Sequence, residues 1–162
     1  VFECRAELRE QLKLHEFGWH MLEHMGDYSR TAWEPAQSAR RFECGSPNML
    51  GAMALEASLS LLEDVGMEEV ARLIAERVQW LQDGLSAIPG VRLHSPLNPA
   101  RRGGIFSFSI DGIDNQQLWR QLMAQQVVCI PRGEGVRFSP HFYTEKRVID
   151  ETLAIVATLA RQ

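Results

Sequence analysis

The sequence is poor in lysine and contains no strongly basic block. Of its 162 residues only Lys13 and Lys146 are lysines, and the formal net charge is −4. Nucleic-acid backbones are bound by clustered lysine and arginine side chains, so this composition predicts no nucleic-acid partner. No apolar run approaches the length of a membrane-spanning helix, so the chain is not expected to cross a membrane. With 45% hydrophobic and 23% charged residues, it is typical of a globular protein with a respectable core.

Cysteine is also scarce. The three cysteines, Cys4, Cys44 and Cys129, are odd in number and do not have the spacing of metal ligands. We therefore expect reduced thiols in a cytoplasmic protein. The first residues do not form a signal peptide, because the apolar part is short and interrupted by charges. The sequence does not start with methionine and opens in what reads as the end of a strand, which suggests a piece of a longer protein.

A loop that leads into an apolar helix is the most informative stretch. Gly45 permits unusual backbone angles, Pro47 favours an extended Ser46, and Asn48 is a candidate N-cap for a helix over residues 48–65. The apolar face of this helix comprises Leu50, Ala54, Ala57, Leu61, Leu62 and Val65. A hydroxyl and N–H groups at a helix start can hold an anion such as a phosphate. The alternative is that the loop is a simple connection, as most such turns are.

The periodicity along the chain predicts an α+β fold. The predicted elements are a strand end at 1–4, helices at 5–14 (buried on the side of Leu8 and Leu12), 48–65 and 67–88, strands at 91–94 and 103–110, a helix at 116–126, strands at 127–130 and 135–139, and a final helix capped by Thr144. No βαβ series and no glycine-rich dinucleotide turn is present. The economical solution is a small, mostly antiparallel sheet covered on one face by helices.

Two histidines in the first part of the chain have a spacing that is found in some metal sites. His20 and His24 have the i, i+4 spacing that can place two imidazoles on one helical face, but no third ligand follows at a usual spacing. We therefore expect His24 and Trp19 to pack in a loop. Residues 27–38 are polar and rich in turn formers, and they are predicted to be an irregular connection.

A second candidate site surrounds Arg137. Its strand neighbours Val136 and Phe138 are expected to point to the opposite face of the sheet. A partly buried arginine requires an anionic partner, and its planar fork suits a carboxylate. The residues alone leave two partners open: a ligand carboxylate, or a structural ion pair with an acidic residue such as Glu134 or Asp150.

These two stretches carry a resemblance to a known family. The run RFECGSPNMLGAMAL resembles the R-F-E-x-G-T-P-N-x-x-G motif of the class V aminotransferases, and RFSPHFYT resembles the segment that ends these enzymes. The family comprises fold-type I pyridoxal-phosphate (PLP) enzymes and includes cysteine desulfurases, selenocysteine lyases and kynureninases. The resemblance implies that Gly45 and Ser46 contact the PLP phosphate, commonly of the neighbouring subunit of a homodimer. It also implies that Arg137 binds the α-carboxylate of an amino-acid substrate, with Arg132 as a second arginine.

The resemblance covers most of the chain but only the final portion of a full enzyme. It implies that residues 1–47 are the end of the large domain and a linker, and that residues 48–162 are the C-terminal small domain. The catalytic lysine of the family would lie upstream, and Lys13 reads as a solvated helix residue. The whole protein is expected to be a transferase or lyase, and this fragment alone is expected to be inactive.

Two departures from the family bear on the reaction. Only residues 133–136 separate Arg132 from Arg137, and this gap lacks the cysteine nucleophile of desulfurases, while Cys129 lies in an apolar strand. Cysteine desulfurase chemistry is therefore disfavoured. The alternative to an enzyme domain is a non-catalytic module that binds amino acids or another protein. The sequence does not specify the substrate.

Overall fold

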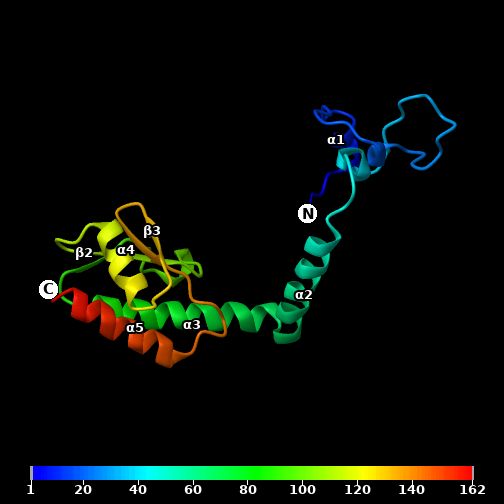
Figure 1. The fold of residues 1–162 in the computed structure, drawn as a ribbon. Helices are drawn as coiled ribbons and strands as arrows, with labels where there is room; N and C mark the ends of the chain where they lie inside the picture. Colours follow the sequence, from blue (N-terminus) through cyan, green and yellow to red (C-terminus); the bar gives the residue numbers. More distant parts are fainter. Residues whose placement is uncertain (1, 162) are drawn as a thin grey trace. The chain divides into compact units, whose positions relative to one another are not determined.

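The computed structural model describes residues 2–161. Its elements are α1 (Ala6–Arg9), η1 (Trp19–Met21), η2 (Ala39–Phe42), α2 (Met49–Val65), α3 (Met67–Ser86), β1 (Val91–Leu93), η3 (Pro99–Arg101), β2 (Phe106–Ile110), α4 (Asn115–Ala124), β3 (Ile130–Arg132), β4 (Gly135–Phe138) and α5 (Lys146–Leu159), with η marking 3-10 helices (Figure 1). Contacts divide the chain into two compact units, Val1–Leu59 and Ser60–Gln162, which are described separately. The predicted domain boundary between residues 47 and 48 stays a prediction.

The second unit is built on one four-stranded antiparallel sheet with the strand order β1-β2-β4-β3. Helices α3, α4 and α5 all contribute side chains to the same buried cluster on one face of this sheet. In Figure 1, α3 and α5 run side by side along that face. The α+β class and the helix-covered antiparallel sheet predicted from the sequence are confirmed.

Alternation along β2 explains how the sheet separates its two faces. Phe106, Phe108 and Ile110 are buried against the helices, whereas the serines between them lie on the opposite face. The register places Phe108 opposite Val136 and Phe106 opposite Phe138, so the buried residues of β2 and β4 share one face. Burying such side chains is the main favourable term in folding.

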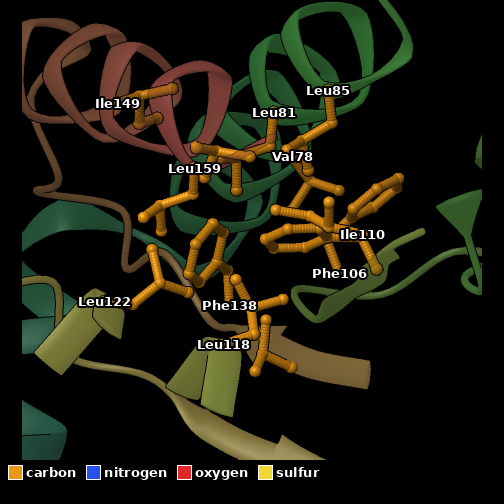
Figure 2. Close-up of a cluster of buried hydrophobic side chains, with 13 residues drawn as sticks. Val78, Leu81, Leu85, Phe106, Ile110, Leu118, Leu122, Phe138, Ile149 and Leu159 are labelled. Carbon is orange, nitrogen blue, oxygen red and sulfur yellow. The ribbon is translucent and has the colours of Figure 1, made fainter. Parts of the chain in front are cut away.

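Helices α3 and α5 complete this core. Figure 2 shows Val78, Leu81 and Leu85 of α3 facing the sheet residues, with Ile149 and Leu159 of α5 beside them. Close approach of the two helices requires a small residue, because a side-chain carbon at Gly84 would collide with Leu153. The buried residues of α3, which are Val70, Val78, Leu81 and Leu85, form a stripe along the helix.

The helix α2 begins and ends as its sequence predicts. The Asn48 Oδ1 atom accepts a hydrogen bond of 2.9 Å from the Gly51 N–H, which confirms the N-cap. Gly66, with φ of 85°, donates its N–H to the carbonyls of Leu62 and Glu63 and ends the helix. The apolar face of α2 is not covered in this chain: α2 has no buried residue, and Leu50 is 81% exposed.

The first unit is mostly irregular. A bridge between Leu22 and Pro35 closes a long loop, and Met21 and Ala36 are buried at its base. The predicted irregular connection at 27–38 is confirmed, apart from the bridge at Pro35. Among residues 2–161, no helix combines the length and apolar character that crossing a membrane requires.

Several predicted element boundaries are wrong. Residues 2–4 form no strand, and Val1 lies outside the described residues. The predicted helix at 5–14 is reduced to α1, and Leu8 and Leu12 are 47% and 43% exposed, so no buried side holds a longer helix. Strand β3 starts at Ile130, later than predicted.

The start of the last helix also differs from its prediction. The Thr144 hydroxyl accepts a hydrogen bond from the His141 N–H and therefore closes a turn. The N-cap position is Glu145, whose side chain makes no capping bond. Val148 in this helix and Met123 in α4 are apolar residues that are 43% and 40% exposed.

Candidate anion-binding sites

Ser46 lies in the loop that leads into α2. The residue is exposed, and among the described residues its hydroxyl has no hydrogen-bond partner. Gly45 does not adopt positive φ, and a side-chain carbon there would meet nothing within 4 Å, so the structure does not use its conformational freedom. An unengaged hydroxyl at the start of a 17-residue helix fits a phosphate group.

Arg41 is a candidate that the sequence reasoning missed. Its Nε atom is buried, and within residues 2–161 it has no hydrogen-bond partner. The neighbouring Arg40 donates to the carbonyls of Leu22 and Glu23, although its own Nε is unpaired in the same part of the chain. The RRFE run at residues 40–43 is the sequence signal that could have identified it, since an arginine whose Nε is buried without a partner is costly unless an anion completes it.

Arg137 lies in the middle of β4 on the face of the sheet that the helices leave open. It is opposite Ser107 of β2 and Ile130 of β3 in the register. Its Nε atom is buried and has no hydrogen-bond partner within the described residues. The alternative of a structural ion pair is not supported: Asp150 pairs with Lys146 at 2.7 Å, and no acidic group of residues 2–161 lies within 4.0 Å of Arg137.

Arg132 is the last residue of β3 and lies opposite Gly135. Residues 133 and 134 form the turn of the β3–β4 hairpin, in which Gly133 has φ of 58°. Arg132 is exposed, and its register position puts it on the same open face as Arg137. The two arginines predicted to bind substrate are therefore neighbours on one surface.

The thiols of Cys129 and Cys44 both have raised pKa values. Burial raises the pKa of the Cys129 thiol to about 11, which keeps it protonated at neutral pH. The carbonyl of Cys129 accepts a hydrogen bond of 3.1 Å from Trp119 Nε1. Burial, followed by the hydrogen bond to Glu16, raises the pKa of the Cys44 thiol. All three cysteines are free thiols, as the sequence predicts.

The two histidines weighed as metal ligands face different glutamates. His20 Nδ1 lies 3.6 Å from Glu43, and His24 Nε2 lies 3.5 Å from Glu34. His20 belongs to η1 and His24 to a turn, so the two histidines do not lie on one face of an α-helix. Lys13 is exposed, as predicted.

A cleft of the second unit contains none of the predicted site residues. It has a volume of about 440 Å³ and lies between α5, the segment after α4 and residues 138–140. Arg137 is instead on the open face of the sheet. Ser46 and Arg137 belong to different units, so the prediction that they serve one cofactor and substrate stays a prediction.

Comparison with known proteins identifies the family. The model of the family "Aminotransferase class-V" matches residues 1–149. The chain is 31% identical over 160 residues to an uncharacterized aminotransferase, YcbU, of Bacillus subtilis, covering 93% of this chain and 39% of the relative. It is 32% identical over 104 residues to a probable cysteine desulfurase of Halalkalibacterium halodurans, covering 64% of this chain and 24% of the relative.

Solved structures share the fold. A cysteine desulfurase from Thermococcus onnurineus NA1 superposes with a TM-score of 0.86 at 22% identity, covering 97% of this chain and 42% of the other. The cystine C-S lyase C-DES, in complex with its product cysteine persulfide, gives a TM-score of 0.79 at 23% identity, covering 94% of this chain and 40% of the other. Another C-DES structure is described as a mutant with glycine covalently linked to the PLP cofactor.

The chain spans about a quarter to two fifths of the length of these relatives. The match to the family model extends over most of the chain, including both predicted motifs. This chain belongs to the aminotransferase class-V family.

Proposed function

We propose that this chain is the substrate-binding and phosphate-contacting part of a PLP-dependent enzyme that acts on an amino acid. The observation that carries the proposal is Arg137. Its guanidinium group faces the open side of the sheet with a buried Nε atom that has no partner among residues 2–161. A carboxylate satisfies such a group through two parallel hydrogen bonds.

Ser46 supplies the second contact in this proposal. Its exposed hydroxyl and the N-terminal end of α2 suit the phosphate of PLP, and the unpaired Arg41 five residues earlier is a further candidate. When bound, the cofactor supplies the electron sink for chemistry at the substrate α-carbon. The residues of this chain orient the two anionic groups, while the catalytic lysine belongs to the part of the protein that precedes this sequence.

Two reaction classes are candidates for the whole protein. The sequence disfavoured cysteine desulfurase chemistry, yet the relatives in H. halodurans and Klebsiella pneumoniae bear that name. Against this name stand the short turn between Arg132 and Arg137, which has no cysteine, and the raised pKa of Cys129. We therefore propose transferase or lyase chemistry on an amino acid and keep desulfurase chemistry as the second candidate. A cytoplasmic homodimer is the proposed setting.

The test measures the visible absorbance of bound PLP in this chain and in a version extended upstream through the catalytic lysine. We expect a stable band only in the extended protein, with Ser46→Ala weakening PLP retention and Ser46→Thr preserving it. If Ser46→Ala and Ser46→Thr retain PLP equally well, Ser46 does not bind the PLP phosphate. If the extended protein shows no absorbance band of bound PLP, the enzyme proposal is refuted, and a non-catalytic binding module becomes the function assigned to this chain.

A further inference from the structure

Three polar residues form a row across the open face of the sheet. Ser107 lies opposite Arg137, and His94, directly after β1, donates its N–H to the Ser107 carbonyl at 2.9 Å. Residues paired in this way point to the same face. Arg137, Ser107 and His94 therefore follow one another on neighbouring strands that are spaced about 4.8 Å apart.

The His94 ring reaches from this row over β4. Its Nε2 atom lies 2.8 Å from Ser109 Oγ, and its Cδ2 atom lies 3.1 Å from the place where a side-chain carbon of Gly135 would be. A side-chain carbon at this position would collide first with the backbone carbonyl of Phe108, so the sheet itself requires glycine here, and the missing side chain also leaves room for the ring. The imidazole therefore lies over Gly135, which is two residues before Arg137 on the same face of β4.

Arg132 approaches the same glycine from the other side, because it is paired with Gly135 across the hairpin. The open face of the sheet therefore carries Arg132, Arg137 and His94 around Gly135. Two acidic residues lie near this face. Asp111 is paired with Arg92 of β1, and Glu134 is exposed in the turn between β3 and β4. The cluster has three groups able to bear positive charge and a buried, unpaired Arg137 Nε in the described part of the chain.

We propose that this cluster is a two-point anion site for an amino acid with a second acidic group. Arg137 holds the α-carboxylate, and His94 and Arg132 hold the second acidic group over Gly135. Two separated cationic contacts favour a ligand with two negative groups over a ligand with one. The inference rests on the proposed function, since it uses the α-carboxylate role of Arg137, and it names dicarboxylic amino acids as the substrate class.

The test titrates the isotope-labelled chain with succinate and with butyrate at constant pH and ionic strength. The side-chain NMR signals of Arg137 and His94 report the binding of each acid. We expect succinate to bind at least about five-fold more tightly than butyrate and to shift both signals. Butyrate is expected to shift Arg137 alone.

Variants separate the second contact from the first. His94→Gln and Arg132→Gln are expected to remove most of the preference for succinate while leaving butyrate binding unchanged. Arg92→Gln is the matched control, since this residue lies on the same face but is paired with Asp111, and it should preserve the preference. The preference of the unmodified chain is measured without any variant, so it remains informative if a variant misfolds.

The outcomes distinguish the two proposals. If both acids shift Arg137 equally and His94→Gln changes neither affinity, the two-point site is refuted and the carboxylate role of Arg137 stands. If neither acid shifts Arg137, the carboxylate role itself fails and the two-point site fails with it.

Discussion

Replacing Arg137 by methionine distinguishes a ligand-binding arginine from a structural one. The unpaired Nε atom is buried, and no acidic group of residues 2–161 lies within 4.0 Å of the side chain. An unsatisfied buried donor costs about 1–3 kcal/mol, and methionine removes that donor while keeping the hydrocarbon stem. The free energy of unfolding of the second unit is therefore expected to stay unchanged or to rise by up to about 2 kcal/mol.

Arg77 provides the matched control. Its side chain is 13% exposed, and it donates to the carbonyls of Thr144 and Leu73 and pairs with Glu76 at 3.1 Å. Arg77→Met breaks these contacts, so we expect a loss of about 2–4 kcal/mol.

Urea unfolding followed through methyl NMR signals of core residues such as Val156 and Leu85 reports the second unit by itself. Breaking a buried ion pair costs about 3–5 kcal/mol, so a loss of this size in Arg137→Met would show that Arg137 has a structural partner. In that case the main support for the substrate-binding proposal would be gone.

Three further predictions follow from burial and capping. Leu85→Ala is expected to lower the free energy of unfolding of the second unit by about 2–5 kcal/mol, because Leu85 is fully buried. Leu50→Ala, on the exposed surface of α2, should change the free energy of unfolding by less than about 0.5 kcal/mol in the same urea assay. Asn48→Ala removes the bond to the Gly51 N–H and should cost about 1 kcal/mol of helix stability, seen as faster amide hydrogen exchange in the first turn of α2, while Asn48→Asp should retain protection. Because burial raises the Cys129 pKa to about 11, its alkylation by iodoacetamide should be slow at pH 8 and should accelerate as the pH approaches 11; rapid labelling at pH 8 would contradict this placement.

Much of the fold follows from local patterns in the sequence. The alternation of Phe106, Phe108 and Ile110 with serines identifies β2, and the glycine at 66 marks the end of α2, since both signals act within a few residues. The start of β3 was misplaced because Gln126 adopts φ of 62° after α4 and residues 127–129 are left outside the ladder. That conformation depends on tertiary packing, which periodicity does not report.

The candidate site was less accessible to sequence reasoning. Arg137 and Ser46 stand in recognisable motifs, so their candidacy follows from the residues and the resemblance. His94 reaches Gly135 only because the register of β1, β2 and β4 brings residues more than 40 positions apart into contact. A strand register is set by many pairwise contacts at once, and no single spacing in the sequence encodes it.

The most direct test of the central claim compares an amino acid with the amine that lacks its carboxylate. The assay measures how tightly each compound perturbs the visible spectrum of the PLP-loaded protein extended upstream. Charge-assisted hydrogen bonds of about 1.5–3 kcal/mol predict that the amino acid binds about 10- to 150-fold more tightly, and that Arg137→Met abolishes the difference. An Arg137→Met protein that still prefers the amino acid to the same extent would contradict the account.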